Sequence, residues 1–335
     1  MRYLPIEKIQ ENAILANPIF NENGAILLSA NTVLKRSFLN RLIQLGYSGL
    51  YIYDSVSEGV DMKELLSEEL RLKTIRALKT LDLDACRVMA NAIVDELLNQ
   101  SDISVDMINV ASYDNYTFIH SINVAVLSVI IGIGSGLSNE RLRQLSQSAL
   151  LHDIGKLSIS LDILNKNGTL SEEEMVIIRS HPQEGYNMVK DNRQLPASVK
   201  NAILSHHENE DGSGYPRGLE SAKISTYAKI IHACDVYDAL VTNRPYRKAM
   251  NPAEALEYLM CNCWVMFEIG CVKKIMQYVS PYPTGITVEL SNGMQALIVQ
   301  QNKINRVRPK IMLIDTQTEI DLMEVLNLTI IKILT

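Results

Sequence analysis

The 335-residue sequence lacks the features that would point to nucleic acids, secretion or membranes. It has 32 Lys and Arg against 38 Asp and Glu, and this net charge of −6 disfavours duplex nucleic acid, whose binders usually carry a basic face. The five cysteines are odd in number and include no C-x-x-C pair, which indicates a reduced setting. The start shows no signal-peptide pattern, and the most apolar run, residues 124–134, is shorter than a membrane span. We therefore expect a cytoplasmic protein without membrane insertion, and a buried helix at 124–134.

The chain divides by pattern into four segments. Turn signals at residues 21–24 and 291–293, each between apolar stretches, predict hairpins near the two ends. Between them, apolar positions recur at helical spacing. The predicted segments are a small α+β module at 1–54, a helical connector at 55–104, a helical domain at 105–280 and a small β-rich appendage at 281–335. The fold class is therefore mainly α.

All six histidines fall in the helical middle, and several stand beside carboxylates. Two dipeptides draw attention, His152-Asp153 and His206-His207. A single histidine on an apolar helix is most often an ordinary buried residue that makes a hydrogen bond. Repetition at several such positions, including His120 and Asp235, favours a metal site instead. Mixed imidazole and carboxylate ligands suit Fe, Mn, Zn or Ni rather than Ca or Mg.

The order and spacing of these motifs resemble the HD-GYP group of HD hydrolases. The sequence reads H…HD-x-x-K…H…HHE-x-x-D-G-x-G-Y-P…D, and the flanks LLHDIGKLSI (150–159) and DALVTNRPYRKAM (238–250) match as well. The resemblance covers roughly residues 105–280. It implies an all-helical HD-type catalytic domain, a metal-dependent phosphodiesterase that hydrolyses cyclic di-GMP to pGpG and on to GMP, and cyclic di-GMP as its partner.

The resemblance also implies a set of metal ligands and two divalent metal ions, with Fe or Mn preferred over Zn or Ni. The implied ligands are His120, His152, Asp153, His181, His206, His207 and Asp235. Asp153 is expected to bridge the two metals. His120, His152 and Asp235 are expected to hold one metal, and His181, His206 and His207 the other. Relatives that bind a third metal have Glu where this chain has Tyr116, so Tyr116 is expected to pack or hydrogen-bond beside a two-metal site.

Other residues are predicted to contact substrate or to support the site. Lys156 lies one helical turn from the catalytic Asp153 and can contact a phosphate oxygen, the alternative being a solvated surface lysine. Arg244 and Arg247 are candidate phosphate clamps, the alternative being surface ion pairs. Tyr246, between them, is a candidate for stacking on guanine.

The loop after the paired histidines is predicted to line the substrate site. Its candidate contacts are Gly214, Tyr215 and Pro216. Tyr215 can stack on guanine, and glycine lets the backbone approach a ligand closely. Glu208 and Asp211 are expected to brace this loop or support the ligands rather than bind metal.

Two other functions stay open at this point. The protein could be a metal-containing sensor that retains cyclic di-GMP with little turnover. It could also be a hydrolase acting on hybrid cyclic GMP-AMP or on a nucleoside monophosphate. The end modules show no chemistry of their own, and the N-terminal module is a candidate site for homodimer contacts or a regulatory partner.

Overall fold

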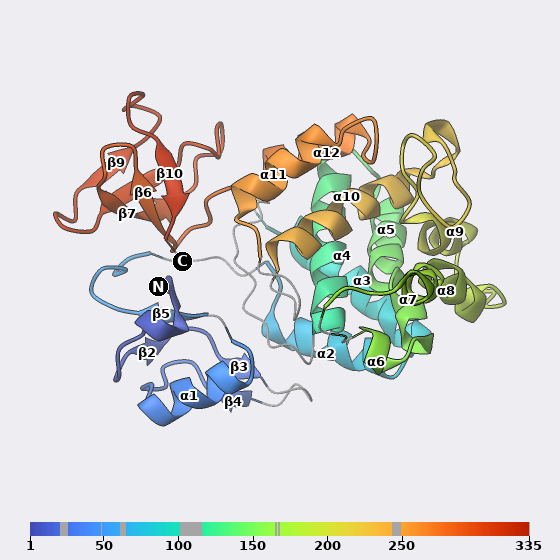
Figure 1. Ribbon diagram of the computed structural model, residues 1–335, viewed down its shortest axis with the longest axis horizontal. Helices are drawn as coiled ribbons and strands as arrows, with labels where there is room; N and C mark the ends of the chain where they lie inside the picture. The colour runs from blue at the N-terminus through green and yellow to red at the C-terminus, as the bar shows by residue number, and fades with distance from the viewer. Residues whose placement is uncertain are drawn as a thin grey trace.

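A computed structural model confirms a mainly helical protein with a small sheet module at each end (Figure 1). The described residues are 1–20, 26–47, 49–60, 65–100, 116–164, 166, 168–242 and 249–334.

The N-terminal module combines short strands with one helix. Its elements are β1 (Arg2–Pro5), a 3-10 turn (Ile6–Lys8), β2 (Ile14–Leu15), β3 (Ile19–Phe20), β4 (Ile26–Leu28), α1 (Arg36–Gln44) and β5 (Gly49–Tyr53). β1, β5 and β2 form a sheet in that order, and β3 pairs antiparallel with β4. The turn predicted at 21–24 lies outside the described residues, but the antiparallel strands on either side agree with a hairpin.

The helical middle places every predicted ligand on a helix, at a helix end or in a 3-10 turn. Its elements are α2 (Glu68–Lys79), α3 (Leu83–Leu98), α4 (Tyr116–Gly134), α5 (Asn139–Leu151), η3 (Ile154–Ser158), α6 (Leu161–Leu164), α7 (Glu172–Arg179), α8 (His181–Val189), α9 (Ala197–Ser205), η4 (Ser221–Lys223), α10 (Thr226–Val241), α11 (Pro252–Cys261) and α12 (Ile269–Tyr278). Ile93 and Leu97 of α3 share one buried core with Ile130 of α4 and Leu145 of α5. The segment predicted as a connector is thus packed into the helical domain.

Helix α4 is the central helix of this domain. Its window Thr117–Gly134 has a mean hydropathy of 1.9, and 67% of it is buried inside the protein. The predicted run 124–134 is the last part of this longer helix, which by length and composition only could cross a membrane. The burial predicted for the run agrees with the structure, because α5, α10 and α3 pack around α4.

The C-terminal module is a five-stranded antiparallel sheet. Its strands are β6 (Thr287–Leu290), β7 (Gln295–Gln300), β8 (Lys310–Leu313), β9 (Glu319–Asp321) and β10 (Ile330–Ile333), in the order β10-β6-β7-β8-β9. β6 and β7 form the predicted hairpin, in which Gly293 adopts a φ of +83° that side chains disfavour.

The two end modules form one body rather than two. Tyr3 and Tyr51 of the N-terminal module share a buried core with Ile286 and Ile298 of the C-terminal module. The Tyr3 backbone N–H also donates to the Gly285 carbonyl at 2.8 Å. Figure 1 shows the two ends of the chain meeting between these modules. No sequence pattern pointed to this association, because it joins segments from opposite ends of the chain.

Candidate metal centre

Three of the predicted ligands stand where helices end. His152 follows α5, His181 lies just after α7 and His206 follows α9. The Nδ1 atom of each ring lies 2.7 Å from the carbonyl oxygen three residues earlier, those of Ala149, Ile178 and Ile203 respectively. Carbonyls in the last turn of a helix need such partners, and a carbonyl can only accept. Nδ1 therefore carries the proton in each neutral ring, and Nε2 offers its lone pair.

His120 is held in the same way by a side chain. It lies on α4, and its Nδ1 is 2.7 Å from Oδ2 of Asp238 on α10. Its Nε2 lies 3.0 Å from Oδ1 of Asp235, one helical turn before Asp238. The i, i+3 spacing of these two aspartates puts both on the face of α10 that meets α4.

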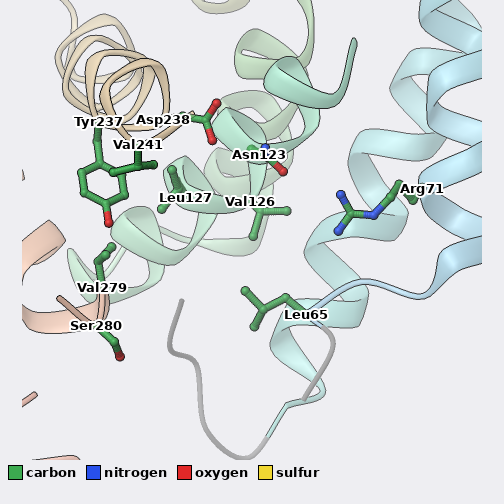
Figure 2. A pocket seen from close by; sticks show the side chains of 10 residues that line it. All are labelled: Leu65, Arg71, Asn123, Val126, Leu127, Tyr237, Asp238, Val241, Val279 and Ser280. Carbon is green, nitrogen blue, oxygen red and sulfur yellow. The ribbon is translucent and has the colours of Figure 1, made fainter. Parts of the chain in front are cut away.

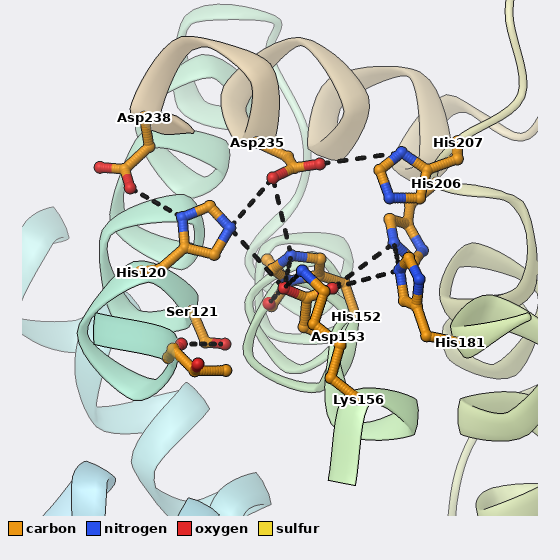
Figure 3. A network of polar contacts seen from close by, with 12 residues as sticks. His120, Ser121, His152, Asp153, Lys156, His181, His206, His207, Asp235 and Asp238 are labelled. Carbon is orange, nitrogen blue, oxygen red and sulfur yellow. Dashed lines mark hydrogen bonds and ion pairs between the residues drawn. The ribbon is translucent and has the colours of Figure 1, made fainter. Parts of the chain in front are cut away.

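The structure brings all seven predicted ligands together in two groups linked by carboxylates (Figure 3). In each group the candidate ligand atoms lie within 4.8 Å of one another, and the groups are His120, His152 and Asp153, and His181, His206 and His207. Asp153 turns Oδ2 toward His152 Nε2 at 3.4 Å and Oδ1 toward His181 Nε2 at 3.2 Å. Asp235 also faces both groups, with Oδ1 3.0 Å from His120 Nε2 and Oδ2 3.9 Å from His207 Nδ1.

The contacts inside this cluster fit bound cations. His152 Nε2 and Asp153 Oδ1 are buried and have no hydrogen-bond partner among the described residues. The Nε2 atoms of His181 and His206 lie 3.1 Å apart although both rings carry their proton on Nδ1. Buried acceptors without donors cost about 1–3 kcal/mol each. Imidazole and carboxylate groups so arranged can hold first-row transition metals.

Burial and nearby charges keep Asp153, His206 and His207 in the protonation states that bind metal. Burial opposes ionisation of Asp153, but the charge of Lys156, with the contacts of His152 and His181, outweighs it and holds the pKa of Asp153 well below its usual range. Burial holds the pKa of both His206 and His207 well below the usual value, so these rings are neutral at pH 7.

His120 behaves differently in the metal-free protein. Burial opposes its charged form, yet hydrogen bonds and charges from Asp235 and Asp238 raise its pKa to about 9. A metal ion must therefore displace a proton from His120 at neutral pH.

Lys156 lies against the site. Its Nζ forms an ion pair with Asp153 Oδ2, and its side chain is 25% exposed. Lys156 is therefore a cation beside the centre that solvent can still reach, and it is not a fully solvated surface lysine.

The loop of residues 212–216 covers the His207 side of the centre. The Tyr215 ring stacks on the His207 ring, with centroids 4.8 Å apart and planes at 27°. A Cβ on Gly214 would lie 2.3 Å from the Asn209 nitrogen, so only glycine fits there. The Arg179 guanidinium lies 5.7 Å from the Tyr215 ring centroid, a contact that no sequence signal predicted.

The two carboxylates of this region hold the backbone of the loop. Buried Glu208 accepts backbone N–H groups from Arg217 and Leu219, both at 2.8 Å. Exposed Asp211 accepts the Ser213 N–H at 2.9 Å. Neither lies in the ligand groups, as the sequence led us to expect.

Two glycines let the halves of the centre approach each other. Gly155, in the turn after Asp153, packs against the start of α8 so closely that a Cβ would lie 1.9 Å from the His181 carbonyl oxygen. A Cβ on Gly185 of α8 would lie 3.2 Å from the Gly155 nitrogen. The spacing of Gly155 and Gly185 in the sequence gives no hint of this contact.

Four predicted side chains are not described by the structure. Arg244, Tyr246 and Arg247 lie outside the described residues, as does the side chain of Tyr116, which begins α4. His232 is buried beside the cluster, where its Nε2 lies 3.1 Å from Asn209 Oδ1 and its ring centroid 6.1 Å from that of His207.

Comparisons with known proteins agree with this geometry. Residues 107–262 match the family model described as HD domain. The chain is 34% identical over 226 residues to the cyclic di-GMP phosphodiesterase PA4108 of Pseudomonas aeruginosa, covering 66% of this chain and 54% of that protein. It is 34% identical over 172 residues to the 3'3'-cGAMP-specific phosphodiesterase 3 of Vibrio cholerae, covering 51% of this chain and 37% of that protein. The chain thus spans about half or less of the length of these relatives.

One solved structure shares the fold over most of the chain. It is Bd1817, described as an HDG"Y"P protein from Bdellovibrio bacteriovorus, with a TM-score of 0.51 at 16% identity, covering 82% of this chain and 97% of that one. The central part of the chain therefore resembles HD domains in sequence and in fold. Its resemblance to the HD-GYP group, drawn from the motifs, is confirmed by the relatives that match it.

Proposed function

We propose that this protein is a metal-dependent phosphodiesterase that hydrolyses cyclic di-GMP to linear pGpG, with GMP as a further product. The observation that carries the proposal is the pair of carboxylates, Asp153 and Asp235, each of which turns one oxygen toward each imidazole group. Carboxylates shared between two cation sites are what hydrolysis assisted by two metals requires. The names of the relatives, cyclic-dinucleotide phosphodiesterases, support the same substrate class.

The protein's own part in this chemistry is to hold two cations in place. When bound, two divalent metal ions supply a hydroxide nucleophile at neutral pH and neutralise charge on the phosphate. The proposed ligands are His120, His152 and Asp235 for one ion and His181, His206 and His207 for the other, with Asp153 between them. The donor set favours Fe or Mn, with Zn or Ni as alternatives. Rings already fixed through Nδ1 need no reorganisation during the reaction.

Lys156 is proposed to bind a substrate phosphate. Its Nζ contacts the Asp153 carboxylate, and its partial exposure lets a bound phosphate oxygen reach the same charge. As a compact point charge, lysine can share its donors between the two. Arg244 and Arg247 stay predicted phosphate contacts, and Tyr246 a predicted base contact.

Tyr215 is proposed to serve both the metal ligands and the substrate. By stacking on His207 it fixes the orientation of a ring whose Nδ1 faces Asp235. The ring is half-buried, and its accessible part, with Gly214 and Pro216 on either side, can meet a guanine base.

The substrate experiment is a direct comparison. Manganese-loaded protein is incubated with cyclic di-GMP and, separately, with 3'3'-cGAMP, and products are resolved by liquid chromatography. We expect pGpG from cyclic di-GMP at the higher rate. Faster cleavage of the hybrid nucleotide would favour the second candidate, which the 34% identity to the Vibrio cholerae relative motivates.

Controls separate turnover from binding. Asp315→Asn changes an exposed carboxylate of the C-terminal module and should leave turnover intact, whereas Asp153→Asn should abolish it. If metal-loaded protein binds cyclic di-GMP stoichiometrically and forms no product, the protein is a sensor rather than an enzyme. A metal-loaded protein that neither binds nor cleaves cyclic di-GMP would overturn the proposal.

A further inference from the structure

The four histidines held through Nδ1 do not have equivalent partners. His152, His181 and His206 each face a neutral backbone carbonyl. His120 alone among them faces a carboxylate, that of Asp238, at 2.7 Å. Both side chains are buried, at 1% and 2% exposure, so solvent screens this contact little. In the other half, Asp235 Oδ2 faces His207 Nδ1 at 3.9 Å, beyond hydrogen-bond distance. The two halves therefore differ in whether a carboxylate accepts a hydrogen bond from a ligand ring.

A carboxylate behind an imidazole changes what the ring can do. Accepting Nδ1–H fixes the tautomer with its lone pair on Nε2. A hydrogen bond to an ionised acceptor is roughly twice as strong as one to a neutral acceptor, and it makes the opposite ring nitrogen a better electron donor. The carbonyls behind the other three rings fix the tautomer but add no charge.

We propose that Asp238 is a positioning residue that makes the His120 half of the centre its tighter metal site. The inference rests on the proposed metal centre and adds that one of its two halves binds metal more tightly than the other. Asp235 cannot replace Asp238 in this role, because it faces Nε2 of His120 rather than Nδ1. Removal of Asp238 should therefore weaken one metal selectively.

The surroundings of Asp238 suit a conservative replacement. Asp238 also lines a pocket between α4 and α10, together with Asn123, Leu127, Tyr237 and Val241 (Figure 2). It thus stands between this pocket and the metal centre. Asparagine has the same shape and keeps an oxygen that can accept Nδ1–H, so Asp238→Asn removes the charge alone. Asp238→Ala removes the charge and the acceptor.

The test measures metal affinity rather than turnover. Wild-type, Asp238→Asn and Asp238→Ala proteins are titrated with zinc against a competing chelator at a pH above about 9, where a proton no longer competes with the metal for His120. Bound metal is counted by elemental analysis. We expect one of the two metals to bind about 10-fold more weakly in the Asn variant and about 100-fold more weakly in the Ala variant, as for other outer partners of metal-bound histidine. The second metal should bind as in wild type.

Reference variants identify the affected site. His120→Ala marks loss of one half and His207→Ala loss of the other, and Asp315→Asn, at an exposed residue of the C-terminal module, is the carboxylate control. Equal weakening of both metals in Asp238→Asn, or no weakening, would overturn the inference. A wild-type protein that binds two metals but cleaves no cyclic dinucleotide would instead overturn the proposed function and leave this comparison valid.

A second measurement covers the case in which Asp238 variants fail to fold, which circular dichroism would detect. Zinc-loaded wild-type protein labelled with ¹⁵N-histidine is studied by NMR, with His120→Ala for assignment. We expect His120 to carry its proton on Nδ1, with that proton shifted further downfield than those of His152, His181 and His206. A proton on Nε2, or a shift equal to the other three, would refute the role of Asp238.

Discussion

Replacing Gly155 by alanine tests whether close backbone contact sets the geometry of the metal centre. An added Cβ would lie 1.9 Å from the His181 carbonyl oxygen, whereas real Cβ atoms stay at least 3.0 Å from other atoms. Both obstacles, this carbonyl and the Gly185 nitrogen at 2.5 Å, are backbone and cannot rotate away. The start of α8 must therefore move by about 1.1 Å relative to the turn that follows Asp153.

Such a shift is large on the scale of metal coordination. His181 Nε2 and Asp153 Oδ1, now 3.2 Å apart, belong to the two segments that must separate. Metal–ligand distances tolerate changes of only about 0.2 Å. We expect the metal at His181, His206 and His207 to be lost first and turnover to fall by about 100-fold. Overpacking should lower the free energy of unfolding by about 1–3 kcal/mol.

Elemental analysis, nucleotide turnover and thermal unfolding of Gly155→Ala check these values. Gly270→Ala in α12 is the matched control, because its Cβ would meet, at 2.8 Å, the carboxylate of Glu268, which caps α12 and has no part in the centre. That control should keep both metals and the wild-type rate. A Gly155→Ala protein with full metal content and unchanged turnover would refute the reasoning, even if its melting temperature fell.

Three further predictions concern charge and metal. Asp153→Asn removes charge from both halves at once, and we expect loss of bound metal by elemental analysis and a roughly 1,000-fold drop in turnover, since several kcal/mol of stabilisation are lost. Chelation should lower the melting temperature of wild type by about 10 °C, because tightly bound metal adds about 4 kcal/mol, and an unchanged melting curve would contradict a structural metal contribution. In metal-free protein, the pKa of His120 is raised from 6.5 to about 9. The charged ring therefore adds about 3 kcal/mol to the free energy of unfolding below pH 6.5, and this contribution is lost as the pH rises through 9. Melting temperatures that stay constant over this range would contradict it.

The candidate ligand residues were accessible to sequence reasoning because metal chemistry constrains residue type and the family resemblance supplies their order. His152-Asp153 and His206-His207 stand in that order with His120, His181 and Asp235, and the structure gathers them within contact distance. The helical class and the terminal hairpins followed from periodicity and turn residues, which are local properties of the chain.

What sequence reasoning missed depends on contacts between distant segments. Asp238 lies three residues after Asp235, a spacing that shows a shared helix face but not which ring it meets. Arg179 reaches Tyr215, and Gly155 reaches α8, only after the helices have packed. The shared core of Tyr3 and Ile298 joins the ends of the chain, and no local pattern marks it.

The helix ends explain why this fold suits a cation centre. α5 and α9 end at the centre, and each is followed directly by a histidine, His152 and His206. His181 follows α7 by two residues and is also the first residue of α8. The C-terminal end of a helix carries partial negative charge, which favours a nearby cation. The same carbonyls orient the rings that would bind it, so one structural feature serves both electrostatics and geometry.

The paired histidines follow from this arrangement. His206 ends α9 and is oriented by the Ile203 carbonyl at 2.7 Å, whereas His207 has left the helix and is oriented by stacking on Tyr215. Because the two rings are held by different means, neighbouring residues can turn toward one centre, and their centroids lie 4.3 Å apart. A regular helix would point them about 100° apart. The loop that closes over His207 is thus as necessary to the pair as the helix that ends before it.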